Sequence, residues 1–327
     1  MSIHKLIQAL NISKNVRKQL MMRRVLLSLI PIILFSIYLY GWRVLALLVI
    51  VTISGVITEY LFERTRKSKP SDSVLVTCFL FTLTLPITIP YWIAIVGIVF
   101  AVTFGKQVFG GFGRNVFNPA LVGRCFIYIS FPSFMTSNWV KPFTSFPGGF
   151  AAWMPNVVDA TTQATPMTLI QLGEEVPYSM GQLIAGNIPG SIGESSVILI
   201  ILAAVYLIYK KTASWQIMVS TLLGMLGIES IFLLIGISNF SNPLMSILSG
   251  GFLFAAVFMA TDPVTAPSQA NVKIIFGLLV GTIASIIRNF SVFPEGVMFA
   301  ILIVNSFVPL MDSIAKNAKS KGKKVTI

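Results

Sequence analysis

The chain has 327 residues, of which 55% are hydrophobic and only 11% charged, and its mean hydropathy is +0.84. A chain this apolar cannot cover a soluble surface with polar groups. Several apolar stretches approach the ~20 residues that a bilayer-spanning helix needs, whereas the alternating segments of about ten residues that form a membrane barrel are absent. We therefore expect an all-α polytopic membrane protein.

Residues 1–24 form a basic arm. No signal-peptidase site follows it and further apolar stretches come later, so we expect this arm to be retained on the cytoplasmic side. Its apolar and basic residues suit a helix lying on anionic lipid, and a disordered tail is the alternative. His4 is the single histidine and precedes every expected span, which excludes a haem held by two histidines within the membrane.

Ten transmembrane helices account for the apolar stretches. We expect them near residues 25–41, 43–62, 73–89, 91–108, 118–134, 195–210, 214–236, 243–260, 272–290 and 294–313. Because positive charge favours the cytoplasmic side, the distribution of Lys and Arg predicts that both termini are cytoplasmic. The net charge of +13 then reflects membrane orientation, and nucleic-acid binding is not expected.

This topology divides the chain into five parts. They are the cytoplasmic arm (1–24), a first membrane repeat (25–134), an extracytoplasmic segment (135–194), a second membrane repeat (195–313) and a basic cytoplasmic tail (314–327). Five spans on each side of the extracytoplasmic segment imply that equivalent helices run in opposite directions, as in an inverted repeat.

A duplicated proline motif agrees with such a repeat. "TLPITIP" at 84–90 and "TDPVTAP" at 261–267 share the pattern T-x-P-x-T-x-P, and "RNVFNP" from Arg114 is echoed by "RNFSVFP" from Arg288. Prolines at alternate positions cannot continue a helix, so we expect extended backbone with unpaired carbonyls at membrane depth. The pattern favours broken helices that meet at a central site, and two ordinary loops are the alternative.

Acidic residues in or beside the spans are candidates for an ion path, since an ionised group there costs several kcal/mol unless it is paired or wet. Asp262 and Glu295 are the stronger candidates, followed by Glu229 and Glu59. A structural ion pair or interfacial position also explains Glu59 and Asp312. The candidate basic partners are Arg114, Arg124 and Arg288.

The segment "FGGFGRNVFNPALVG" at 109–123 is glycine-rich but lacks the third glycine of a dinucleotide-binding fingerprint. Its glycines predict close backbone packing or a re-entrant turn. Arg114 and Asn115 could serve an anionic or planar ligand. Cys78 and Cys125 fit buried hydrophobic positions, and half of an iron–sulfur site shared with a partner is the alternative.

The extracytoplasmic segment contains "VVDATTQATPMTL" at 157–169. Threonines in such a loop usually cap helices and turns. An exposed threonine hydroxyl can also be esterified by an enzyme, which would make this loop a covalent anchor.

The motifs "GRNVFNPALVGR", "VDATTQATP" and "FMATDPVTAP" together resemble the family that contains the D subunit of the Rnf complex and the B subunit of the Na+-translocating NADH:quinone reductase. The resemblance implies a multi-pass protein of the bacterial cytoplasmic membrane, and the short arm and tail favour the Rnf type. It also implies that a flavin transferase attaches FMN through its phosphate to Thr165, with Asp159, Thr162 and Ala164 as the recognition frame. Gln163 stands where the family pattern has glycine.

By this resemblance the chain is an electron-transfer subunit of an ion-translocating (Na+ or H+) ferredoxin:NAD+ oxidoreductase, without complete activity alone. Its expected partners are the other membrane and peripheral subunits of an Rnf-type complex, including an extracytoplasmic FMN subunit. The family also implies a second, non-covalent flavin, riboflavin. No metal is expected in this chain.

Two further interpretations remain open at this point. A small-solute channel or transporter would also suit inverted five-helix repeats with a broken-helix site. A scaffold with a degenerate flavin site would explain Gln163. A transporter should be colourless and carry solute in liposomes, whereas a redox subunit should be yellow and associate with other membrane proteins.

Overall fold

The computed structural model describes residues 19–136, 139–155, 165–172, 174, 176–194, 196–237, 242–291, 293 and 295–324. All regular elements of these residues are helices. Asp159, Thr162, Gln163, Ala164 and His4 lie outside the described residues.

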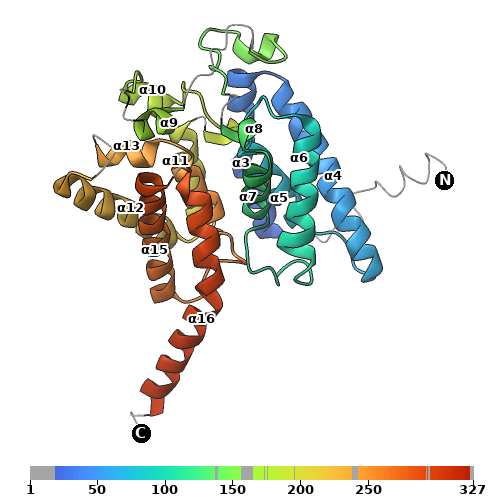
Figure 1. Ribbon diagram of the computed structural model, residues 1–327. Coiled ribbons are helices and arrows are strands. Elements are labelled where there is room, and N and C mark those ends of the chain that lie inside the picture. The colour runs from blue at the N-terminus through green and yellow to red at the C-terminus, as the bar shows by residue number, and fades with distance from the viewer. Residues whose placement is uncertain are drawn as a thin grey trace.

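The first half of the chain contributes five main helices, drawn from blue to green in Figure 1. They are α3 (Leu20–Tyr40), α4 (Arg43–Thr65), α5 (Asp72–Leu83), α6 (Tyr91–Val102), which continues into the π-helix η1 (Thr103–Gln107), and α7 (Pro119–Ser130).

The second half, drawn from yellow-green to red, packs beside the first (Figure 1). It contains α11 (Val197–Tyr209), α12 (Trp215–Ile235), α13 (Pro243–Leu248), α14 (Phe252–Phe254), the π-helix η4 (Ala255–Met259), α15 (Ala270–Phe290) and α16 (Gly296–Lys324). Short helices connect the halves: α8 (Pro132–Thr136), η2 (Gly148–Ala151), α9 (Pro166–Gln171), α10 (Met180–Ala185) and η3 (Ile192–Glu194).

Five helices in the described part of the chain are long and apolar enough to cross a membrane: α3, α4, α12, α15 and α16. Four shorter apolar helices accompany them: α5, α6 with η1, α7 and α11. Large apolar side chains such as Leu34, Ile57, Leu202 and Leu234 lie on the outer surface, where lipid would contact them. The chain is a multi-pass membrane protein. Helical segments occur at each of the ten expected spans, and the count of ten crossings stays a prediction.

No helix continues through either proline motif, as the sequence predicts. α5 ends at Leu83, directly before the first T-x-P-x-T-x-P motif, and the second motif separates η4 from α15. The segment predicted as one span at 243–260 is also broken, because Gly250 and Gly251 adopt φ angles of +66° and +63° between α13 and α14. Only glycine adopts such angles readily, so the sequence itself breaks this helix.

Glycines also set the contact between α12 and α15. Gly277 and Gly281 lie one turn apart on α15, and side chains at these positions would collide with Ser220 and the Thr221 carbonyl of α12. Such G-x-x-x-G spacing allows two membrane helices to approach closely. Close packing also explains Gly123, where a side chain would meet Ala101 and the Gly97 carbonyl, as the sequence predicted for this glycine-rich segment.

Candidate functional site

The backbone of the first proline motif is held by an arginine from α4. Arg43 donates hydrogen bonds to the carbonyl oxygens of Ile87 and Ile89, each at 2.8 Å. The Leu85 carbonyl accepts a third bond from the Ile192 amide at 3.0 Å. These three carbonyls are therefore paired, and the prediction of unpaired carbonyls in this motif is wrong for them. Proline removes helical partners, and a distant guanidinium replaces them.

The second proline motif is closed by its own aspartate. Asp262 accepts hydrogen bonds from the Val264 amide (3.2 Å) and the Thr265 hydroxyl (3.3 Å). The donors lie two and three residues after the aspartate, and an Asp side chain commonly closes a local turn with such bonds. Ser268, just after the motif, donates from its amide and hydroxyl to Asp312 of α16 at 3.2 and 2.9 Å.

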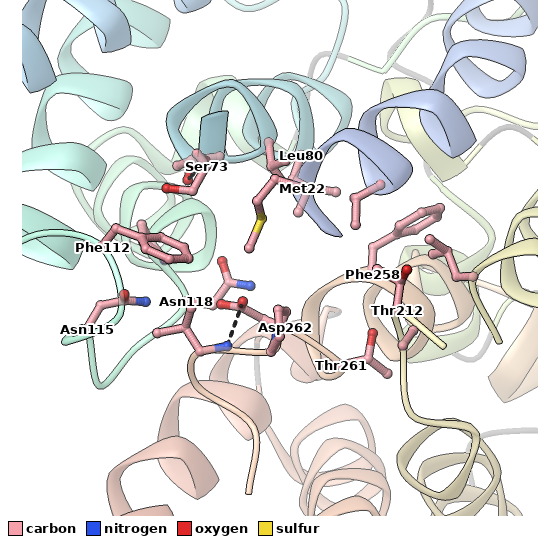
Figure 2. A pocket seen from close by; sticks show the side chains of 18 of the residues that line it. Met22, Ser73, Leu80, Phe112, Asn115, Asn118, Thr212, Phe258, Thr261 and Asp262 are labelled. Carbon is pink, nitrogen blue, oxygen red and sulfur yellow. Dashed lines mark hydrogen bonds between the residues drawn. The ribbon is translucent and has the colours of Figure 1, made fainter. Parts of the chain in front are cut away.

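A pocket lies between the two halves beside this second motif (Figure 2). It encloses about 50 Å³, which is room for a small group of water molecules. The first half contributes Lys106, Ser73, Asn115 and Asn118, and the second contributes Thr212, Thr261 and Asp262. Figure 2 shows the Asn118 and Asp262 side chains close together near its centre.

Asn118 joins the two halves at this pocket. Its Oδ1 caps α7 by accepting from the amides of Ala120 (3.0 Å) and Leu121 (3.4 Å). Its Nδ2 donates to the carbonyl oxygen of Met259, the last residue of η4, at 3.3 Å. The asparagine thus uses both ends of its amide, which explains an Asn-Pro helix start here.

A buried ion pair adjoins the pocket. The ammonium of Lys106, in η1, lies 2.6 Å from Glu59 Oε2, and both side chains are almost completely buried. The same ammonium donates to the hydroxyls of Ser73 (2.6 Å) and Ser71 (3.0 Å). Glu59 was an ion-path candidate from the sequence, but its lysine partner was not predicted. Lys106 lies 47 residues away, and only the fold brings the two groups together.

A second polar cluster lies where the halves meet the connecting segment. Arg124 of α7 pairs with Glu295, as one of the predicted partnerships, and also reaches the Ser191 hydroxyl at 3.4 Å. Arg288 donates to the carbonyl oxygens of Ser246, Ser249 and Gly250 at the break between α13 and α14. The break thus resembles the first proline motif, in that an arginine satisfies the carbonyls that the interrupted helix leaves.

Glu229 of α12 is also buried, and its Oε1 accepts from the Ser285 hydroxyl (2.5 Å) and Asn289 Nδ2 (2.7 Å) of α15. The four acidic candidates therefore fall at separate places. Asp262 lines the pocket, Glu59 adjoins it through Lys106, Glu295 pairs with Arg124, and Glu229 lies between α12 and α15.

Thr165 lies at the start of α9 as a half-buried N-cap. Its Oγ1 accepts from the Thr168 amide at 3.2 Å and lies 2.9 Å from the Thr168 hydroxyl. The capping role expected for threonines of this loop is confirmed at this residue. Two residues later Met167 is buried, and its side chain lies against Gly250 in the break between α13 and α14.

The remaining candidate residues lie in different environments. Asn115 is buried and lines the pocket, donating to the Phe117 carbonyl at 3.2 Å. Arg114 is exposed and does not line it. Cys78 is buried in α5 and Cys125 half-buried in α7, both as free thiols. Within the described residues, no group of three or more His, Cys, Asp or Glu could hold a metal ion.

Interrupted helices, buried ion pairs and a pocket between two halves define a polytopic helical membrane protein with a polar interior. The chain belongs to the NQR2, RnfD, RnfE family, whose model matches residues 8–321. Members of this family include membrane subunits of ion-translocating oxidoreductase complexes. The resemblance inferred from the motifs is confirmed.

Relatives of two kinds are similar to this chain. It is 33% identical over 317 residues to the D subunit of the ion-translocating oxidoreductase complex of Halorhodospira halophila, covering 89% of this chain and 88% of the relative. It is 36% identical over 302 residues to the D subunit of the Na(+)-translocating ferredoxin:NAD(+) oxidoreductase complex of Acetobacterium woodii, covering 90% and 88%. It is 35% identical over 296 residues to the B subunit of the Na(+)-translocating NADH-quinone reductase of Klebsiella pneumoniae, covering 86% and 68%.

Proposed function

We propose that this chain is the membrane electron-transfer subunit of an ion-translocating ferredoxin:NAD+ oxidoreductase complex of the Rnf type, carrying FMN esterified to Thr165. The observation that carries the proposal is the position of Thr165. Its hydroxyl caps α9, and Met167 of α9 packs against Gly250 at the break between α13 and α14. Membership of the family supports a redox subunit within a larger complex.

The residues around Thr165 fit a phosphoester. An esterified Oγ1 loses its proton but keeps lone pairs, so it can still accept from the Thr168 amide, and the Thr168 hydroxyl can donate to it. Attachment therefore preserves the cap of α9. The flavin supplies one-electron chemistry when bound, and the chain's own residues fix where it sits. A non-covalent riboflavin is part of the same proposal.

Met167 connects the attachment site with the membrane interior. Its side chain is buried against Gly250, whose carbonyl accepts from Arg288 at 2.9 Å. If FMN is esterified to Thr165, the Met167–Gly250 contact would join the helix that carries the flavin to the break between α13 and α14, and the flavin would supply one-electron chemistry there.

The second part of the proposal is the ion path. Asp262 and Glu295 are its main carboxylates, one at the pocket and the other at the polar cluster under the connecting segment. The first proline motif bonds to η3 of that segment through Leu85, whereas the second is followed by Ser268, which bonds to Asp312 in the middle of α16, sixteen residues after the start of that helix. This placement at different ends supports an inverted repeat, with an N-terminus and C-terminus on the cytoplasmic side.

In-gel flavin fluorescence of the denatured chain tests the attachment. The chain is coexpressed with a flavin transferase, and wild type is compared with Thr165→Ala and with the neighbouring control Thr168→Ala. We expect fluorescence in wild type and the control and none in Thr165→Ala. A dark wild-type band, with the transferase proven active on another substrate, would contradict covalent attachment.

Copurification distinguishes the proposed redox subunit from the alternative functions. We expect the chain to copurify with other membrane subunits and with ferredoxin-dependent NAD+ reduction. Copurification with NADH-dependent quinone reduction would instead identify a counterpart of the B subunit of the quinone reductase. A colourless chain that carries a small solute alone in liposomes would support a transporter.

A further inference from the structure

Lys106 is a buried base that the proposed electron path does not use. Its side chain is 2% exposed, and the Glu59 side chain is 1% exposed. Each of the three hydrogens of the ammonium has an oxygen to bind: Glu59 Oε2, Ser73 Oγ and Ser71 Oγ, at 2.6, 2.6 and 3.0 Å. The ammonium therefore lies in a cage of one carboxylate and two hydroxyl oxygens.

The cage is organised without the lysine. Glu59 Oε1 accepts from both the amide and the hydroxyl of Ser71 at 2.9 Å, and the hydroxyls of Ser71 and Ser73 lie 2.8 Å apart. These bonds orient the oxygens independently of Lys106. Carboxylate and hydroxyl oxygens are the ligands that hard cations prefer, and an ammonium can stand in for a small monovalent cation at such a place.

The cage opens onto the pocket between the halves. Ser73 and Lys106 line that pocket. Asp262, Asn118 and Thr261, which Figure 2 shows together with Ser73, add further oxygen atoms to it. Lys106 and Asp262 are the charged residues of its lining. When Glu59, Asp262 and Lys106 are all ionised, their charges sum to one negative charge, which a single monovalent cation would neutralise.

A purely structural role explains the lysine poorly. Removing two charges from water costs so much that a buried ion pair adds little or no stability over apolar residues of the same volume. Lys106 also lies in a π-helix, where the backbone is locally wound differently from the α-helix before it and where functional residues often occur.

We infer that Glu59, Ser71 and Ser73 form a binding site for a monovalent metal cation, in which the ammonium of Lys106 is a tethered competitor. A cation that enters from the pocket displaces the ammonium, and the ammonium returns when the cation leaves. A role of this site in transport rests on the proposed function. The site itself rests only on the distances among Lys106, Glu59, Ser71 and Ser73.

The experiment measures equilibrium binding of 22Na+ to the purified complex. Lys106→Ala and Lys106→Gln remove the competing charge, and the glutamine keeps donors for the serines if the alanine variant fails to fold. We expect either variant to gain one Na+ per chain, or to bind Na+ about tenfold more tightly than wild type. The double variant Lys106→Gln/Glu59→Gln should lose the gain, and methylammonium should compete with Na+ in Lys106→Ala.

The control is Lys273→Ala, which changes a lysine of α15 outside the cage and should bind Na+ as wild type does. Unchanged Na+ binding in folded Lys106→Ala or Lys106→Gln complexes would overturn the site. A gain of Na+ binding in the lysine variants, combined with no cation transport by the wild-type complex, would keep the site and contradict the proposed function instead.

Discussion

Asn118 Nδ2 donates a hydrogen bond to the carbonyl oxygen of Met259, across 141 residues of sequence. The donor caps the first turn of α7, and the acceptor ends the π-helix η4 that leads into the second proline motif. One amide thus fixes the two halves to each other at the wall of the pocket.

Substitution of Asn118 should therefore separate its two roles. Asn118→Ser keeps a neutral cap acceptor but loses the donor to Met259, whereas Asn118→Ala loses both. We expect Asn118→Ala to lower the unfolding free energy by about 1–2 kcal/mol and Asn118→Ser by less. Thermal unfolding in detergent measures both. Equal effects of the two variants would show that the cap contributes nothing.

Gly281 should tolerate no side chain. Gly281→Val would push against the Thr221 carbonyl and the Met225 amide of α12, so we expect a loss of about 1–3 kcal/mol or failure to fold. Gly227→Val is the matched control, since nothing lies within 4 Å of the position its Cβ would take. Yield of monodisperse protein and its melting temperature are the readouts. A Gly281→Val protein as stable as the control would refute the close α12–α15 contact.

The pair Arg124–Glu295 should behave as a buried ion pair. Glu295→Leu alone leaves a buried guanidinium without its carboxylate, and we expect it to cost about 3–5 kcal/mol. The double variant Arg124→Met/Glu295→Leu removes both charges and should recover most of that stability. Chemical denaturation of the single and double variants makes the comparison. A double variant no more stable than Glu295→Leu would exclude strong coupling between these two residues.

Asp262→Asn should uncouple the ion path from electron transfer. Asparagine keeps an oxygen for the Val264 amide, so the turn should form while the charge at the pocket is lost. We expect electron transfer to continue with fewer ions moved per electron, measured in proteoliposomes. Asp312→Asn, which changes the partner of Ser268 in the middle of α16, is the control. Full electron transfer and full pumping in both Asp262→Asn and Glu295→Gln complexes would show that the path lies elsewhere.

The sequence predicted the features that depend on local chemistry. Proline at alternate positions predicted that no helix continues through either motif, whether as a broken helix or as a loop, and the glycine-rich segment predicted close packing around Gly123. The helical segments also fall where the apolar stretches predicted spans. The threonines of the extracytoplasmic loop predicted a helix cap, and Thr165 makes one. Each of these conclusions needs only neighbouring residues.

The sequence did not predict contacts that depend on how distant helices pack. Arg43 and Ile87 are 44 residues apart, and Lys106 and Glu59 are 47 residues apart. No residue pattern specifies such a pair, because the register between two membrane helices sets it. Arg124 was named as a possible partner for the acidic residues, and the fold selects Glu295, 171 residues away.

The covalent flavin on Thr165 is the central claim, and the intact mass of the chain isolated from its native complex tests it most directly. We predict a mass increase equal to one FMN less one water, which fragmentation places at Thr165 and which Thr165→Ala removes. An unmodified mass in a complex that still transfers electrons would contradict the account.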